Sequence, residues 1–106
     1  MFYKKLEDIQ IKELIPGSKV RFLHSENMTL AYWNFEPGVN IPEHSHPHEQ
    51  VCNIINGEFE LDINGNKKYI KPGDIAIIPP NIKHSGKSIS ECYIIDVFYP
   101  IREDYK

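Results

Sequence analysis

The segment Pro42-Glu43-His44-Ser45-His46-Pro47-His48-Glu49-Gln50 holds three histidines and a glutamine within a few residues of one another. Its two prolines exclude a regular helix, because proline lacks a backbone N–H and its ring clashes with the preceding turn. We therefore expect extended backbone, in which residues two apart point to the same side. On this spacing one face carries His44, His46 and Gln50, joined by His48 if the strand stays regular.

This spacing predicts a metal site. Imidazole nitrogen is the commonest protein ligand for divalent transition metals. His44 and His46 can chelate one ion, and a further ligand must come from elsewhere in the chain. The candidate is His84, which follows the turn at 79–81. A His-x-His doublet alone is equally compatible with ordinary surface or core histidines, but the cluster and its flanking turns favour a metal site.

The remaining two histidines receive other interpretations. His24 stands alone in the sequence, and we predict a structural role for it. For His48 we favour a place at the rim of the pocket or behind the ligands over direct contact with the metal.

Short segments with apolar residues at every second position fill most of the chain on either side. Thr29, Ala31, Trp33 and Phe35 alternate with other residues between 28 and 36, and Phe59, Leu61 and Ile63 alternate with acidic residues between 57 and 65. This period of two indicates half-buried strands. Similar segments at 20–23, 50–55, 67–71, 74–78 and 91–99 bring the total to seven or eight strands.

The spacing of these strands predicts the fold class. Eight prolines and six glycines separate them into short runs, and Asn64-Gly65 predicts a type I′ hairpin turn. Strands every 8–12 residues are typical of a β-sandwich or barrel. We predict one all-β domain over residues 1–106, with a short strand or turn in the first fifteen residues.

Composition and charge exclude several classes of protein. The chain has 106 residues, 41% of them hydrophobic, and a net charge of −3, which disfavours nucleic acid as the main partner. No apolar run approaches the ~20 residues of a membrane helix, and the N-terminus lacks a signal-peptide pattern. Two cysteines are too few for a disulfide framework, so we expect Cys52 and Cys92 as free thiols in a cytoplasmic protein.

Two groups of residues resemble the paired motifs of the cupin superfamily. They are Gly38-x5-His44-x-His46-x3-Gln50-x6-Gly57 and Gly73-x5-Pro79-x-Asn81-x2-His84. The resemblance implies a single-domain jelly-roll barrel (a double-stranded β-helix) with a metal inside. It also implies that the metal ligands are His44, His46, Gln50 and His84.

The sequence departs from the cupin pattern at three positions. Gln50 stands where the pattern usually has glutamate, Asn81 where it often has glycine, and Ser88 where it often has asparagine. Three imidazoles and an amide are all neutral and leave the metal's charge uncompensated, whereas a glutamate would lower it to about +1. We therefore expect a strong Lewis acid that favours an anionic substrate. These ligands do not select among nickel, zinc, iron, manganese and cobalt.

Asp96 and Arg102 are the other candidates for function. Asp96 lies in an apolar run, and on parity it shares a face with Phe98 that looks into the predicted barrel. A carboxylate there is either functional or paired at a strand end. Arg102 follows the break at Pro100 and is either a solvated surface residue or a bidentate clamp on a substrate carboxylate.

The two segments at 44–50 and 96–104 together resemble the KdgF family of pectin-degradation cupins. Members of that family convert 4,5-unsaturated monouronates from pectin or alginate breakdown to linear 5-keto-4-deoxyuronate. The resemblance implies that Asp96, Phe98 and Arg102 are catalytic or substrate-binding residues, and that the substrate is a small anionic sugar acid.

Two other functions stay open on the sequence. The chain is either that enzyme, or a non-catalytic cupin that binds or senses a small molecule, or a cupin dioxygenase, which Gln50 disfavours. One cupin fold supports many chemistries, so the fold does not choose among them. The resemblance further implies a homodimer, for which the sequence offers apolar N-terminal residues that could pair across a two-fold axis. They are Phe2, Tyr3, Leu6, Ile9, Ile11 and Leu14.

Overall fold

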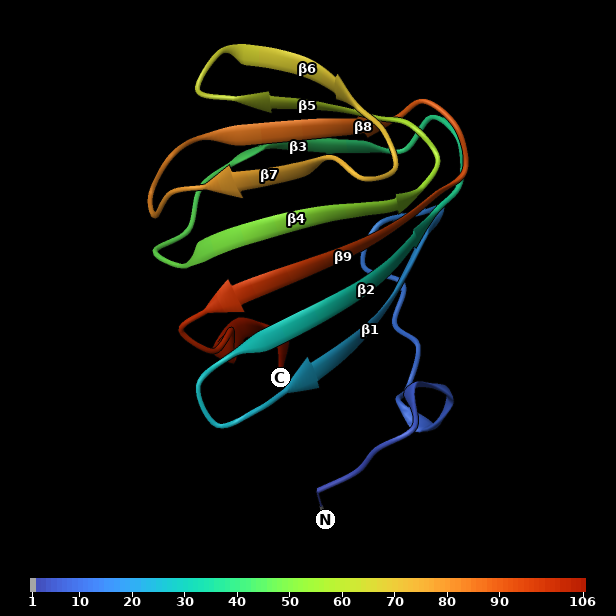
Figure 1. The fold of residues 1–106 in the computed structure, drawn as a ribbon, viewed down its shortest axis with the longest axis vertical. Helices are drawn as coiled ribbons and strands as arrows, with labels where there is room; N and C mark the ends of the chain where they lie inside the picture. The colour runs from blue at the N-terminus through green and yellow to red at the C-terminus, as the bar shows by residue number, and fades with distance from the viewer. Residues whose placement is uncertain (1) are drawn as a thin grey trace.

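The computed structural model describes residues 2–106 as two antiparallel β-sheets that face each other (Figure 1). The strands are β1 (Ser18–His24), β2 (Thr29–Phe35), β3 (Asn40–His44), β4 (Glu49–Asn56), β5 (Phe59–Ile63), β6 (Asn66–Ile70), β7 (Ile75–Ile78), β8 (His84–Ser88) and β9 (Cys92–Tyr99). Two 3-10 turns, η1 (Leu6–Asp8) and η2 (Glu103–Tyr105), lie near the ends of the chain. The all-β prediction is confirmed.

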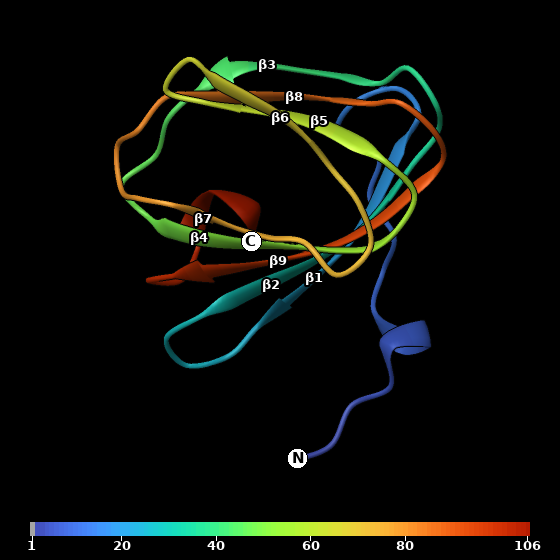
Figure 2. The same cartoon turned by 45° about the horizontal axis from the view of Figure 1, so that its top comes forward.

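The chain passes repeatedly from one sheet to the other after β2. One sheet has the order β1-β2-β9-β4-β7 and the other β3-β8-β5-β6. Figure 2 shows the two layers with the interior between them. Because β3 and β8 pair in one sheet while β4 and β9 pair in the other, the two histidine segments meet at one end of this interior.

The interior is built by the alternation that the sequence shows. In β2, Thr29, Ala31, Trp33 and Phe35 are all buried, as are Phe59 and Leu61 of β5. Aromatic rings stack through the core, with Trp33 and Phe35 5.3 Å apart between ring centroids. Burying apolar area of this kind contributes about 25 cal/mol per Å². The period-two prediction for these strands is therefore confirmed.

The predicted hairpin at Asn64-Gly65 is also confirmed. Ile63 of β5 pairs with Asn66 of β6, and both turn residues have positive φ, 52° and 84°, as a type I′ turn requires.

The sequence predicted extended backbone at 42–50, which overlaps β3, but it predicted no strand at β8. β3 contains a proline and β8 is the polar run His-Ser-Gly-Lys-Ser, so neither shows an apolar alternation. Both become strands because they pair with each other, and β8 also pairs with β5. Tertiary pairing overrides weak local propensity here. The structure accordingly has more strands in residues 2–106 than the seven or eight predicted.

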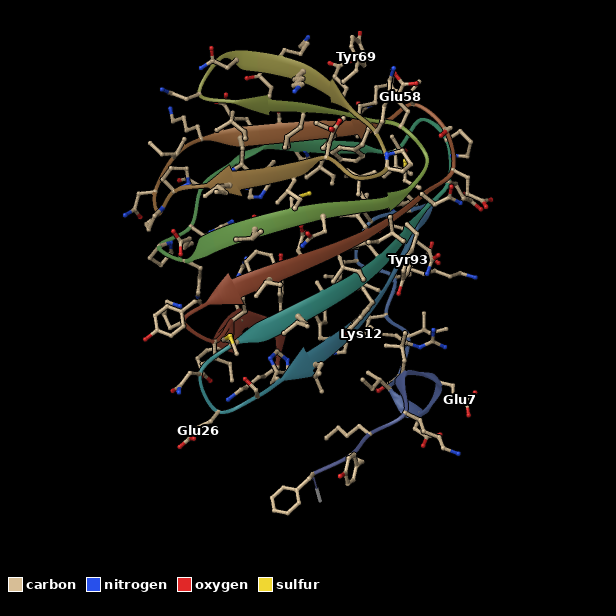
Figure 3. The ribbon with its side chains drawn as sticks, viewed as in Figure 1. Glu7, Lys12, Glu26, Glu58, Tyr69 and Tyr93 are labelled. Atoms are coloured by element: carbon tan, nitrogen blue, oxygen red, sulfur yellow. The ribbon has the colours of Figure 1, made fainter. Side chains whose placement is uncertain are left out.

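The N-terminal segment leaves the body of the molecule. Lys12 forms an isolated antiparallel β-bridge with Val20 of β1. The 3-10 turn η1 precedes Lys12 in the chain and lies away from both sheets (Figure 1). In Figure 3 the side chains of Glu7 in this segment and Glu26 in the β1–β2 turn extend outward from the molecule. Residues 2–106 contain no helix long and apolar enough to cross a membrane.

Candidate metal centre and pocket

Three histidines from separate parts of the chain converge at one end of the interior. His44 ends β3, His84 begins β8, and His46 lies in the β3–β4 connection. Their candidate ligand nitrogens all lie within 4.8 Å of one another. Among residues 2–106 these three form a group that can hold a metal ion.

A backbone carbonyl fixes the tautomer of each ring. The Nδ1 atoms of His44, His46 and His84 lie 2.8, 3.0 and 2.9 Å from the carbonyl oxygens of residues 42, 48 and 82. A carbonyl only accepts hydrogen bonds, so each Nδ1 carries the proton and each Nε2 presents a lone pair. Metal-binding histidines are oriented in this way by their second nitrogen. The buried Nε2 of His84 has no protein partner in the described chain.

Gln50 completes the candidate donor set. It lies in β4, is buried, and its Oε1 is 3.1 Å from Nε2 of His46. With the His46 proton on Nδ1, both of these atoms are hydrogen-bond acceptors. A shared cation would satisfy both, which is the second observation by which these residues fit a metal.

Two of these rings, His46 and His84, stay neutral at neutral pH because their pKa values are lowered. Burial, together with the nearby charges of Arg102 and His84, lowers the pKa of His46 to about 4. Burial also lowers the pKa of His84, with His44 and Arg102 contributing. Because a metal competes with protons for imidazole, a metal that binds these two rings need not displace a proton from them.

A cavity of about 130 Å³ lies beside the three histidines, between the sheets. Aromatic and aliphatic side chains form most of its wall, including Trp33, Phe59 and Phe98. Small-molecule sites typically combine such an apolar wall with a few convergent polar groups. The polar groups here are Gln50, Asp96, Arg102 and the three histidines.

Asp96 faces this cavity from β9, as its parity predicts. Cys52 of β4 pairs with it across the strands, and the carboxyl oxygen Oδ1 is buried without a hydrogen-bond partner in the described chain. Burial raises the pKa of Asp96 to about 6, although the nearby polar side chains of Gln50 and Cys52 act in the opposite direction. A carboxyl with this pKa can exchange a proton near neutral pH.

Arg102 is not the solvated surface residue that one interpretation allowed. It is buried, with only 5% of its surface exposed, and it lines the cavity. The interpretation as a bidentate clamp also needs revision, because Asp104 already occupies one edge of the guanidinium. Nε and Nη2 of Arg102 donate to the Asp104 carboxylate over 2.9 and 2.7 Å.

Comparison with known proteins identifies the family. The cupin domain family matches residues 31–98 of the chain. The chain belongs to the cupin family. It is 31% identical over 97 residues to the pectin degradation protein KdgF of Dickeya dadantii (strain 3937), a match covering 89% of this cupin and 88% of that protein.

Solved structures agree with this fold. An RmlC-like cupin from Shewanella frigidimarina NCIMB 400 superposes with a TM-score of 0.93 at 27% identity, covering 100% of this cupin and 96% of that chain. KdgF from Halomonas sp. superposes with a TM-score of 0.88 at 24% identity, covering 94% of each chain. The latter likeness concerns the fold alone.

Two departures from the cupin motifs are structurally accommodated. Asn81 adopts a φ of 65°, the left-handed region that glycine favours and asparagine tolerates, and its N–H donates to the carbonyl of His46 over 2.8 Å. Ser88 is buried, and its Oγ accepts from the Val39 N–H at 2.9 Å. Asn81 thus joins the two histidine segments of this cupin.

The other histidines lie outside the metal group, as predicted. Nδ1 of His24 lies 2.9 Å from Oγ1 of Thr29, near the opposite edge of the larger sheet. The His48 ring lies 5.6 Å from that of His46, and its neighbours include the backbone of Ile101 and the charged side chains of Arg102 and Asp104. His48 therefore lies between the three-histidine group and the segment that carries Arg102.

Sequence analysis missed two residues that touch the site. Asp104 pairs with Arg102, and the Tyr105 ring lines the cavity and stacks on Phe22 at 4.4 Å between centroids. Their positions two and three residues after Arg102, beyond a proline, gave no periodic signal. The signal available was the run Arg-Glu-Asp-Tyr at 102–105, which places a cation, two carboxylates and an aromatic ring in consecutive positions.

Proposed function

We propose that this cupin is a metal-dependent enzyme that converts 4,5-unsaturated monouronates, released by pectin or alginate breakdown, to linear 5-keto-4-deoxyuronate. The observation that carries the proposal is the convergence of three Nε2 lone pairs beside a buried carboxyl of raised pKa in one small cavity. The 31% identity to a pectin degradation protein supports this substrate class.

The reaction is an isomerisation in which atoms balance without added water. The bond between C1 and the ring oxygen breaks, and the C1 hydroxyl loses its proton to become an aldehyde. The ring oxygen becomes the C5 ketone as the C4–C5 double bond takes up a proton at C4. One group that accepts a proton and returns it at a second position therefore suffices.

Asp96 fits the role of that group. Its carboxyl faces the cavity, and a pKa of about 6 leaves both protonation states accessible near neutral pH. Phe98 would pack against the sugar ring, and Arg102 would offset the charge of the substrate carboxylate.

The metal would be held by His44, His46, Gln50 and His84, whose donor atoms fit a divalent transition metal. When bound, it supplies Lewis-acid polarisation of the sugar oxygens. Its identity among nickel, zinc, iron, manganese and cobalt is not fixed by these donors.

The test is loss of ultraviolet absorbance of a 4,5-unsaturated monouronate, measured against its spontaneous rate. Metal-loaded protein should accelerate the loss, and both EDTA and His84→Ala should abolish the acceleration. His24→Gln alters a histidine outside the metal group and should keep the metal content of the wild type. No acceleration by protein shown to contain metal would contradict the proposal and favour a non-catalytic binding cupin.

A further inference from the structure

The guanidinium of Arg102 is held on three sides. The Asp104 carboxylate accepts from Nε and Nη2, with the shorter contact at 2.7 Å. The rings of Phe98 and Tyr105 lie 4.7 and 4.0 Å from Cζ of Arg102, as measured to their centroids. Stacking fixes the plane of the guanidinium, and the two parallel hydrogen bonds fix its rotation within that plane.

The backbone of Arg102 is anchored as well. Its N–H donates to Oγ1 of Thr29 over 2.8 Å, and the threonine is fully buried at the start of β2. This hydrogen bond fixes the backbone of Arg102, from which the side chain extends, against β2 of the larger sheet. Few rotamers remain available to a long side chain that is anchored at both ends.

This arrangement leaves one nitrogen unused. Nη1 of Arg102 is buried and has no hydrogen-bond partner in residues 2–106. Arg102 lines the same cavity as Asp96 and the three histidines. A buried cationic donor without a partner is costly, so a ligand acceptor at this position would be strongly favoured.

We propose that Asp104 is a positioning residue that turns Arg102 so that Nη1 alone meets the substrate carboxylate, end-on instead of as a bidentate clamp. This inference rests on the proposed function for the identity of the substrate. Asp104 itself stays outside the cavity, and its side chain is 57% exposed. Its neutralisation should therefore leave the fold intact while it releases the guanidinium.

The kinetic test compares two variants that each remove one negative charge from η2. Asp104→Asn replaces one acceptor oxygen with an amide donor facing the guanidinium. Glu103→Gln is the matched control, because the Glu103 carboxylate pairs with Lys106 at the surface, whereas the Arg102 guanidinium pairs with Asp104. We expect Asp104→Asn to raise KM about tenfold with kcat within about twofold of wild type, since a charge-assisted hydrogen bond to the substrate is weakened in ground and transition state alike.

A binding experiment separates this inference from the proposed function. Calorimetry compares glucuronate with its uncharged amide, glucuronamide, on metal-loaded protein. Wild type and Glu103→Gln should prefer glucuronate, and Asp104→Asn should lose most of that preference. That pattern without turnover of the unsaturated uronate would contradict the proposed function alone. Equal binding of both probes by wild type, or an unchanged preference in Asp104→Asn, would overturn the inference about Asp104.

Discussion

At the scale of single residues, backbone carbonyls set the tautomers of the three histidines that could hold a metal. Each of His44, His46 and His84 donates its Nδ1 proton to a carbonyl only two residues away in sequence. The local backbone therefore selects the tautomer before any ion arrives. With each proton held on Nδ1, His44, His46 and His84 would offer a metal three Nε2 lone pairs without a change of tautomer.

Substitution of Asp96 tests the proton transfer. Asp96→Asn keeps the shape of the side chain but removes the exchangeable proton, so turnover should fall by about 100-fold or more. Metal content, measured by elemental analysis, should not change, because Asp96 is not among the candidate ligands. Asp62→Asn, on the outward side of β5, serves as the control and should retain activity. Turnover by Asp96→Asn at the wild-type rate would exclude Asp96 as the proton carrier.

Acid should destabilise the metal-free protein through His46. Its folded-state pKa of about 4 lies below the ordinary value of 6.5, so between these values the unfolded chain binds a proton that the folded chain does not. The free energy of unfolding therefore falls as pH decreases from 6.5 towards 4, by up to about 1.4 kcal/mol per pH unit from this group.

Urea unfolding of EDTA-treated protein at pH 7.5 and pH 5 measures the decrease in the free energy of unfolding. His46→Gln removes the titrating group, so its stability should depend less steeply on pH than that of wild type. An equal slope in both proteins would show that other groups dominate.

At the scale of elements, two glycines in turns serve different purposes. Gly57 joins β4 to β5 with a φ of 85°, and a Cβ there would collide with the backbone carbonyl of Glu91. Gly65 joins β5 to β6 with a nearly identical φ of 84°, and a Cβ there would have open space around it. Backbone conformation alone requires glycine at Gly65, whereas close packing against the segment before β9 adds a second requirement at Gly57.

Alanine substitutions at Gly57 and Gly65 allow the two costs to be compared as losses in the free energy of unfolding. Gly65→Ala should lower the free energy of unfolding by about 1–2 kcal/mol, the cost of a left-handed alanine. Gly57→Ala should lower it by about 3 kcal/mol or more, because the steric clash adds to that cost. Chemical denaturation of the two variants provides the comparison, and equal losses would contradict the packing argument.

At the scale of the whole molecule, the larger sheet carries apolar side chains on its outer side too. The strand registers place one apolar residue of each strand in a single row across this side. The row consists of Leu23, Leu30, Val97, Val51 and Ile77. Ile75 and Ile77 are 65% and 63% exposed. An antiparallel sheet that faces water normally carries polar residues there.

We propose that a second copy of the chain covers this side, in agreement with the homodimer expected from the sequence. The row has no charged side chain, so two copies can pack across a two-fold axis without opposing like charges. The N-terminal segment, from which the sequence also suggested pairing, exposes Phe2 and Tyr3 to 90% and 92%.

Light scattering should therefore give a mass of twice 12.4 kDa. Ile77→Lys should shift it towards the monomer, whereas Tyr69→Lys, on β6 of the other sheet, should not. A monomeric wild type would contradict the dimer.

Local sequence patterns were enough to predict the alternating strands, the β5–β6 turn and the grouping of His44, His46 and His84. Those features depend on local periodicity, turn chemistry and motif spacing, which neighbouring residues fix. Parity also correctly placed Asp96 and Phe98 on the inner face of β9.

Other features of the fold and of the candidate site depend on contacts between segments that are distant in the sequence. β3 and β8 exist because distant segments pair, and the raised pKa of Asp96 results from burial between the sheets. The orientation of Arg102 depends on aromatic rings and a carboxylate gathered around it, together with a threonine 73 residues away. The pKa of a side chain and its orientation depend on residues that are close in space, and the periodicity of the sequence does not predict which residues those are.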